Sequence, residues 1–271
     1  MTTAAVVAPS ARSARPSPLR TVRDTLVIAE RNLIAYVRIP EALFFSSVQP
    51  IMFVLLFRYV FGGAIKTTNP GGYVNYLMPG VFVQTVAFGA VGTAIGLAED
   101  LQKGLIERFR SLPMARSAVL AGRTVADLCR NVAVTALITG VGYAVGFRPS
   151  HALGFLAAVL LLLLFAYALS WGFAAVGLSA PNSETAQVMS FPLLFPLTFA
   201  SSAFVPVQSM PGWLQAFAKY QPVSEVIDAV RGLMVGGVPD VSGHVIISVA
   251  WAAGFFLVLA PLAVNRYRNR T

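Results

Sequence analysis

The residues of this sequence that could do covalent chemistry do not form a catalytic pattern. The three lysines, Lys66, Lys103 and Lys219, each follow a residue other than glycine, so none completes the Gly-Lys pair of a phosphate-binding P-loop. His151 and His244 are too far apart for the HExxH spacing of a zinc protease. If the protein moves a solute uphill, its energy therefore comes from another subunit.

One acidic and one sulfur-containing residue lie near the start of an apolar stretch. Asp127 stands between Arg123 and Arg130, and because no second carboxylate lies deep in an apolar segment, a buried proton or sodium relay has little support. We interpret Asp127 as part of an interfacial ion pair. Cys129 is the only cysteine, so it forms no internal disulfide, and we expect a small buried hydrophobe.

The segment from Glu99 to Arg116 has helical spacing. Its apolar residues recur at intervals of four, four and three: Leu101, Leu105, Phe109 and Leu112. Its remaining surface is charged: Glu107, Arg108 and Arg110. Pro113 ends the helix. Such a helix either docks into a groove on a soluble partner or lies on the bilayer surface, and the spacing leaves both open.

A second unusual segment runs from Pro211 to Gly237. It is too polar to span a membrane and too apolar for a free loop, and Pro222 interrupts it. Its first half begins with Trp213, and its second half carries an apolar stripe opposite charged residues. We expect it to re-enter the outer leaflet or to cap the pore, where protein or a water-filled cavity surrounds it.

These segments connect long apolar stretches. The chain has 271 residues, of which 56% are hydrophobic and 11% charged, against about 25% charged in soluble domains. Lipid must therefore cover part of its surface. Six stretches approach the ~20 residues needed to cross a bilayer as a helix and are too long for barrel strands. They cover residues 43–60, 76–98, 125–147, 152–178, 188–207 and 245–264.

The predicted organisation is an all-α polytopic membrane protein in three parts. Residues 1–18 read as a disordered cytoplasmic tail, residues 19–40 as an amphipathic interfacial helix, and residues 41–271 as the six-span domain. Gly92 and Gly96 form a small-xxx-small pair that permits close helix packing. Arg58, near the outer end of the first span, either snorkels to the headgroups or lines a substrate exit.

The charges set the orientation. The net charge is +9, but the charges cluster at the ends of apolar runs, which is typical of membrane topology rather than of nucleic-acid binding. With the N-terminus inside, fifteen Lys and Arg residues fall on the inner side and four on the outer side. Both termini are therefore expected in the cytoplasm, with an even number of spans.

Four sequence pieces together resemble a known family. They are the run from Asp100 to Arg116, Gln49-Pro50 with Phe61-Gly62-Gly63, Tyr76-Leu77-Met78-Pro79-Gly80, and Pro211-Gly212-Trp213 with Gln221-Pro222-Val223-Ser224. In this order they resemble the type II ABC exporter permeases, and in particular the daunorubicin-resistance branch of actinobacterial drug exporters. The resemblance covers about residue 19 to the C-terminus.

The resemblance implies roles for named residues. A coupling helix would rest on a separate ATPase through Glu99, Asp100, Leu101, Leu105, Glu107, Arg108, Phe109, Arg110, Pro113 and Arg116. A pair of outer re-entrant helices would include Pro211, Trp213, Phe217, Pro222, Asp228 and Arg231. Pro50 and Arg58 are candidates for the pore or exit.

The resemblance also implies partners. Two P-loop ATPase subunits would bind ATP and Mg²⁺, a second copy or paralogue of the permease would complete the pathway, and the chain itself would be neither enzyme nor cofactor-binding. The expected cargo is hydrophobic antibiotics, drugs or lipids, exported across a bacterial inner membrane. The alternatives are a polysaccharide or other cargo on the same fold, or a self-sufficient secondary transporter.

Overall fold

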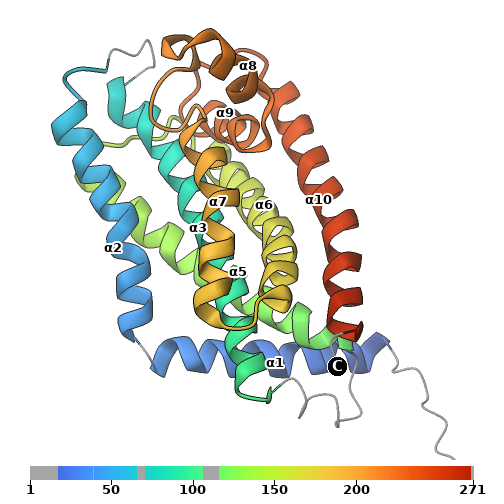
Figure 1. Ribbon diagram of the computed structural model, residues 1–271. Coiled ribbons are helices and arrows are strands. Elements are labelled where there is room, and N and C mark those ends of the chain that lie inside the picture. The colour runs from blue at the N-terminus through green and yellow to red at the C-terminus, as the bar shows by residue number, and fades with distance from the viewer. Residues whose placement is uncertain (1–17, 39, 66–70, 106–115, 270–271) are drawn as a thin grey trace, which may run out of the picture.

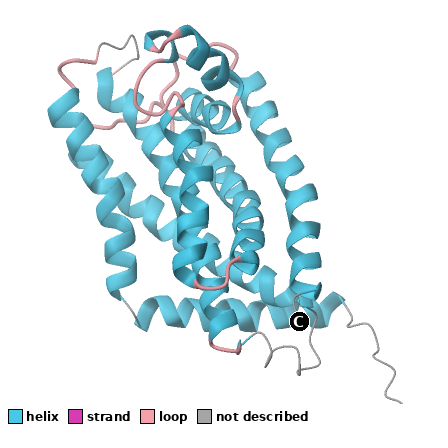
Figure 2. Cartoon of the chain, viewed as in Figure 1, coloured by secondary structure: helices cyan, strands magenta, loops and turns pink. Residues whose placement is uncertain are grey.

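The computed structural model describes residues 18–38, 40–65, 71–105 and 116–269, and over these residues its regular structure is entirely helical (Figures 1 and 2). In lipid, a helix satisfies every backbone polar group within its own segment. The elements are α1 (Pro18–Arg38), α2 (Pro40–Leu56), the π-helical turn η1 (Phe57–Phe61), α3 (Gly72–Gln102), α5 (Arg116–Ala144), α6 (Ala152–Ser179), α7 (Ser183–Phe199), the 3₁₀ turn η2 (Val207–Ser209), α8 (Gly212–Tyr220), α9 (Pro222–Met234) and α10 (Val241–Asn269).

Helix α1 lies across the foot of an upright bundle (Figure 1). It packs along α5 through a buried face that includes Ile28 and Ala29, whereas Leu19, Val22 and Leu26 on its other side are exposed. A helix is therefore present where residues 19–40 were predicted to form one, but it ends at Arg38, and its place at the membrane interface stays a prediction. Helix α2 begins at Pro40, a residue that fits the first position of a helix. The described C-terminal end of α10 lies at the same end of the bundle as α1 (Figure 1).

Helix α3 forms the centre of the bundle and packs against α6 and α7. Its buried residues include Leu77, Met78 and Phe82. The approach of α6 is close at Gly177, where an added Cβ would lie 2.3 Å from the carbonyl oxygen of Ala94. Glycine therefore allows the two backbones to meet near the C-terminal ends of both helices.

Four of the predicted spans correspond to helices that are long and apolar enough to cross a membrane. These are α3, α6, α10 and residues 118–144 of α5. Of the other two, α2 with η1 contains a shorter apolar helix, Ser47–Phe61, and α7 has only 17 residues. The predicted count of six spans depends on these two segments. The predicted fifth span, 188–207, is misplaced, because α7 begins at Ser183 and ends at Phe199. Its start is fixed by Asn182, whose side chain accepts a hydrogen bond from the Thr185 amide at 2.7 Å.

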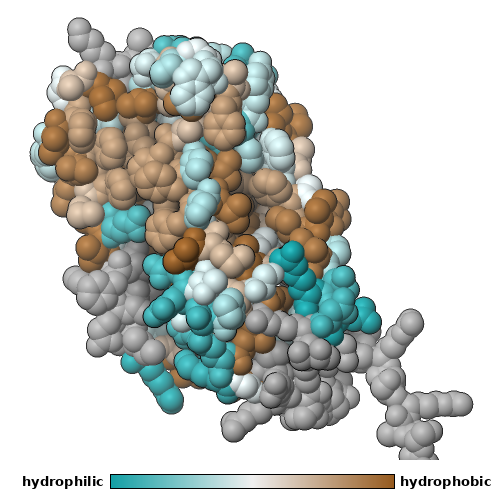
Figure 3. Space-filling model, in the orientation of Figure 1, coloured by the Kyte–Doolittle hydropathy of each residue, from teal (hydrophilic) through white to brown (hydrophobic). Residues whose placement is uncertain are grey.

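Apolar residues cover the middle of the visible surface over α2, α7 and α10, and polar residues gather toward its lower end (Figure 3). Cys129 was expected to be buried, and this is wrong: it is exposed. It lies in a shallow apolar groove between α1 and α5, beside Leu33 and Val125. The helical period explains the difference, because Cys129 follows the buried Asp127 by two positions and so faces away from it.

Candidate functional site

A group of charged and polar residues joins α1, α3 and α5 at the foot of the bundle. Arg31 of α1 donates from Nη2 to Oδ1 of Asp100 on α3 at 2.9 Å, and Nη1 of Arg123 on α5 lies 3.6 Å from the other Asp100 oxygen. Arg123 also places Nε 3.8 Å from Oδ2 of Asp127. We call Arg31, Tyr36, Asp100, Arg123 and Asp127 the inner cluster.

Asp127 is the most enclosed member of the inner cluster, with no exposed surface. Tyr36 of α1 and Thr93 of α3 donate their hydroxyl protons to its two carboxylate oxygens, each at 2.5 Å. Burial, followed by the charge of Asp127, raises the pKa of the Tyr36 hydroxyl to about 12, so Tyr36 stays protonated and continues to donate. The expected ion pair of Asp127 is confirmed with Arg123, but it is buried between helices.

Arginines of α5 occupy space left by glycines of α3. A Cβ on Gly96 would lie 1.6 Å from Nη2 of Arg123, and a Cβ on Gly92 would lie 2.7 Å from Nη1 of Arg130. Arg123 donates to the Gly92 carbonyl at 3.3 Å, and Arg130 donates to the Gly89 carbonyl. The small-residue spacing therefore admits guanidinium groups between α3 and α5, rather than only bringing two backbones together.

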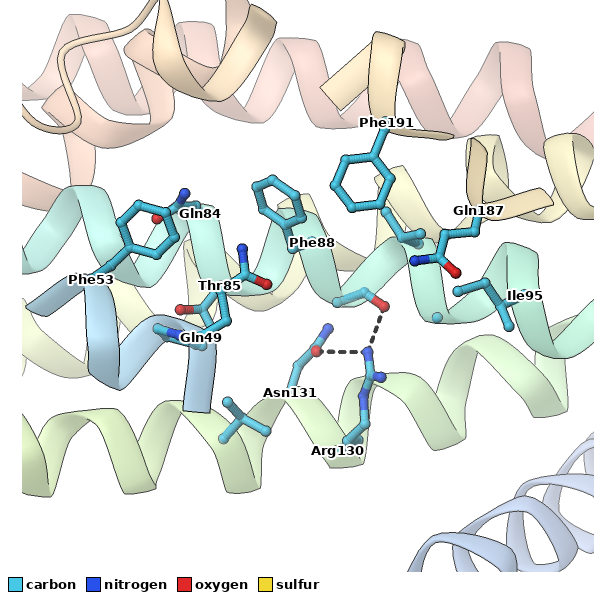
Figure 4. Close-up of a pocket in the computed structure, with 15 residues that line it drawn as sticks. Gln49, Phe53, Gln84, Thr85, Phe88, Ile95, Arg130, Asn131, Gln187 and Phe191 are labelled. Atoms are coloured by element: carbon cyan, nitrogen blue, oxygen red, sulfur yellow. Dashed lines mark hydrogen bonds between the residues drawn. The ribbon is translucent and has the colours of Figure 1, made fainter. Parts of the chain in front are cut away.

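A pocket of about 420 Å³ opens between α2, α3, α5 and α7, and Arg130 is one of the residues that line it (Figure 4). Arg130 and Asn131 project from α5 toward the cavity, opposite Phe88 and Phe191 (Figure 4). Its polar lining residues come from all four helices: Gln49, Gln84, Thr85, Arg130, Asn131 and Gln187. A largely apolar cavity with a few polar groups is the usual form of a small-molecule site.

The two residues proposed for a pore or exit differ in position. Pro50 lines the pocket from α2. Arg58 does not line it; it lies in the π-helical turn η1, with its guanidinium 6.0 Å from the ring centre of Tyr59. A π-helical turn inside a helix often marks a functional position, but the role of Arg58 stays a prediction.

A second polar network holds α9 against α3 at the opposite end of the bundle. Arg231 donates to the carbonyl oxygen of Ser202 at 2.6 Å and to that of Tyr76 at 3.3 Å, and its Nη1 pairs with Oδ1 of Asp228 at 2.6 Å. Its guanidinium also lies 3.9 Å from the ring centre of Tyr76. We call Tyr76, Ser202, Asp228 and Arg231 the outer network.

The segment predicted to re-enter the outer leaflet forms two short helices, α8 and α9, at the end of the bundle away from α1 (Figure 1). Pro222 occupies the first turn of α9, where its missing N–H costs no hydrogen bond. Pro211 precedes α8, and Trp213 and Phe217 are exposed on it. Of the six residues predicted for this region, Asp228 and Arg231 form an ion pair.

The predicted ATPase-coupling residues are described only in part. Asp100 belongs to the inner cluster, Glu99 forms an exposed pair with Lys103 at 3.4 Å, and Leu101 and Leu105 are partly buried. Arg116 begins α5. The others lie outside the described residues: Glu107, Arg108, Phe109, Arg110 and Pro113.

The amide side chains of the pocket were not foreseen from the sequence. Gln84 and Asn131 interrupt apolar spans. Polar residues at membrane depth cost free energy, so those that occur there often serve a function. That signal was available, but the partners of each amide depend on how α3 and α5 pack. Among the residues that the structure describes, no group of three or more His, Cys, Asp or Glu side chains could hold a metal ion.

Comparison with known proteins identifies the family. Residues 23–235 match the model of the ABC-2 type transporter family. The chain is 37% identical to "Daunorubicin resistance ABC transporter permease protein DrrB1" of Streptomyces coeruleorubidus, over 94% of this chain and 90% of that protein. It is 30% identical to "Probable doxorubicin resistance ABC transporter permease protein DrrC" of Mycobacterium tuberculosis, over 92% and 90%. The chain belongs to the ABC-2 type transporter family.

Proposed function

We propose that this chain is the membrane-spanning permease subunit of an ATP-driven exporter that moves hydrophobic antibiotics, other drugs or lipids out of the cell. The observation that carries the proposal is the 37% identity, over 94% of the chain, to a relative named as a daunorubicin resistance permease. A second relative is named for doxorubicin resistance. The pocket of about 420 Å³ has the size of a site for molecules of this kind.

The energy comes from partner subunits. The sequence has no Gly-Lys pair for a P-loop, and in this proposal two separate P-loop ATPase subunits bind ATP and Mg²⁺. Their contact is the coupling segment 99–116, which connects the inner ends of α3 and α5. The inner cluster ties these same two ends to α1. Movement of the coupling segment is therefore passed to the helices that line the pocket, and a second permease copy or a paralogue completes the pathway.

The chain crosses the membrane six times in this proposal, with both termini in the cytoplasm. Helix α2 and η1 together cover residues 40–61, which extend about 33 Å at 1.5 Å per residue. Helix α7, with 17 residues, extends about 26 Å by the same measure. Both are close to the ~30 Å of a hydrocarbon core.

Thiol labelling tests this topology. In a Cys129→Ala background, single cysteines placed at Gln208 and at Asn182 should react with a membrane-impermeant maleimide from opposite sides of intact cells. Gln208 should be labelled from outside, and Asn182 only after permeabilisation. Reaction of both positions from the same side would show that α7 does not cross the membrane.

Purification from the native host in mild detergent tests the function. A P-loop ATPase should be recovered with the chain, and the complex in liposomes should move a hydrophobic drug only when ATP is supplied. Transport by the chain alone, without ATP and with sensitivity to a proton gradient, would instead identify a secondary transporter.

A further test addresses the coupling segment. Glu107→Ala and Arg108→Ala should weaken ATPase binding or separate hydrolysis from export, while membrane insertion stays normal. Normal drug-stimulated ATP turnover in both variants would contradict the coupling assignment.

A further inference from the structure

Three N–H groups at the pocket have no hydrogen-bond partner among the described residues. They are Nε2 of Gln84, Nδ2 of Asn131 and Nε of Arg130. The Gln84 and Asn131 side chains are themselves buried, with residues 4% and 3% exposed. A buried donor without an acceptor costs free energy, so three at one cavity need an explanation. Acceptor atoms of a bound molecule would supply the missing bonds once these side chains turn toward the cavity.

The charge of the pocket favours the same kind of molecule. Arg130 donates to the Gly89 carbonyl and to Oδ1 of Asn131, and no described carboxylate lies within 4 Å of it, whereas Arg31, Arg123 and Arg231 each have one. None of the residues found to line the pocket is Asp or Glu. The local charge is therefore positive in a region of low dielectric constant, which attracts an anion and repels a cation.

The apolar part of the lining includes three aromatic rings. Phe53, Phe88 and Phe191 come from three different helices, and the rings of Phe88 and Phe191 meet edge to face with centroids 6.1 Å apart. Aromatic faces and edges of this kind pack well against a flat ring system. Arg130 and Asn131 lie across the cavity from Phe88 and Phe191, whereas Gln84 lies on the same side as the rings (Figure 4).

We propose that this pocket binds flat apolar molecules that carry acceptor oxygens, such as carbonyl, phenolate or carboxylate groups, and that it selects against molecules with a cationic group at that end. The acceptor oxygens face Gln84, Asn131 and Arg130, and the ring system lies against Phe88 and Phe191. The inference rests on the proposed function, because it takes the bound molecule to be the exported cargo.

A pair of fluorescent probes tests the charge preference. The full chain in phosphatidylcholine nanodiscs at pH 7 is titrated with 9-anthracenecarboxylate and, separately, with 9-(aminomethyl)anthracene, which have the same ring system and opposite charges. The carboxylate should bind at least tenfold more tightly. Equal binding of the two probes, or tighter binding of the amine, would overturn the proposal.

Substitutions test the donors. Gln84→Leu and Asn131→Leu should each weaken carboxylate binding about tenfold, since each removes one hydrogen bond to a charged acceptor. Gln84→Leu should also raise the melting temperature, because an unpartnered buried donor is lost. Arg130→Gln should abolish the preference for the carboxylate. Unchanged probe binding in all three folded variants would contradict the assignment.

Thr135→Val is the matched control. The Thr135 hydroxyl is also buried without a partner among the described residues, but it does not line the pocket. This variant should raise the melting temperature and leave probe binding unchanged. A loss of binding equal to that of Gln84→Leu would show that general packing, rather than the pocket donors, controls the probe.

A lipid headgroup offers the same acceptor chemistry, and a further arm separates it from cargo. Replacing part of the phosphatidylcholine with phosphatidylglycerol should leave carboxylate binding within twofold. Loss of probe binding would assign the donors to an anionic lipid and overturn the cargo site. These measurements use neither ATP nor the ATPase, so their failure leaves the exporter proposal standing, and failure of ATP-driven export leaves the binding site standing.

Discussion

Asp127 illustrates how single residues connect helices in this protein. Its carboxylate accepts from hydroxyls on α1 and α3 and faces an arginine of its own helix. A buried ion pair contributes little net stability, because both charges lose water, but removing one partner leaves an uncompensated charge. The inner cluster therefore favours one arrangement of α1, α3 and α5 over others.

Tyr36→Phe tests the contribution of the inner cluster through pH. The pKa of Tyr36 is raised to about 12 in the folded protein, against about 10 in an unfolded chain, so the folded state holds this proton more strongly. The resulting stabilisation is fully present below pH 10 and is lost as the pH rises through 12.

Between pH 10 and pH 12, thermal unfolding in detergent should show a steeper loss of stability for the natural protein than for Tyr36→Phe. The hydroxyl of Tyr59, which is exposed, provides the control: Tyr59→Phe should follow the natural protein. If stability falls with pH in parallel for all three proteins, Tyr36 does not contribute to the pH dependence of stability.

The contacts made by Arg231 depend on the planar shape of its guanidinium group. It donates to two carbonyls, pairs with Asp228 and stacks on Tyr76, and a lysine cannot reproduce this planar set of contacts. Arg231→Lys should therefore lower the free energy of unfolding by about 2 kcal/mol and speed hydrogen exchange in α9. Lys219→Met, at an exposed site, should change neither the stability nor the exchange. Normal exchange in Arg231→Lys would contradict the bracing role.

At this scale the sequence was informative about residue types but not about partners. The charged residues Asp127, Asp228 and Arg231 were selected in advance, and each of them forms an ion pair in the structure. The amides Gln84 and Asn131 were not selected, because an isolated polar residue in an apolar span does not reveal which neighbours it meets. Periodicity identifies the face of one helix, whereas a pocket needs the packing of several.

The contact between α6 and α3 depends on the absence of a side chain at Gly177. Gly177→Ala would place a methyl group 2.3 Å from the Ala94 carbonyl oxygen, so one backbone must move, at a cost of about 1–3 kcal/mol. Gly254→Ala on α10 is the control, because an added Cβ there meets nothing within 4 Å.

Melting temperatures in detergent compare the two variants. Gly177→Ala should be less stable than the natural protein, and Gly254→Ala should be equal to it or slightly more stable, since alanine favours the helical conformation. Similar melting temperatures for both variants would show that α6 can move away from α3 without cost.

Helix positions were predictable, and their ends were less so. The amphipathic helix and the stretches that became α3, α6 and α10 follow from apolar length and periodicity alone. Helix α7 was displaced because hydropathy continues past Phe199, where the backbone leaves the helix before Pro206. Its true start depends on a cap at Asn182, which averaging over a hydropathy window does not detect.

For the whole molecule, the inner cluster joins α1, α3 and α5 at one end of the bundle. Asp100 contacts Arg31 on α1 and Arg123 on α5, so Asp100→Asn should weaken both links while leaving the pocket intact. With the partner ATPase present, we expect more ATP hydrolysed per molecule exported, by several fold. Glu99→Gln, which breaks the exposed pair with Lys103, should keep the normal ratio. An unchanged ratio in Asp100→Asn would exclude this route of transmission.

The position of Cys129 has a practical consequence for measuring such movements. It is the only cysteine of the chain and is exposed in the groove between α1 and α5. A thiol-reactive dye therefore attaches at one known place without any substitution. An assembly with two copies carries two dyes, and energy transfer between them becomes a molecular ruler that reads one distance before and after nucleotide is added.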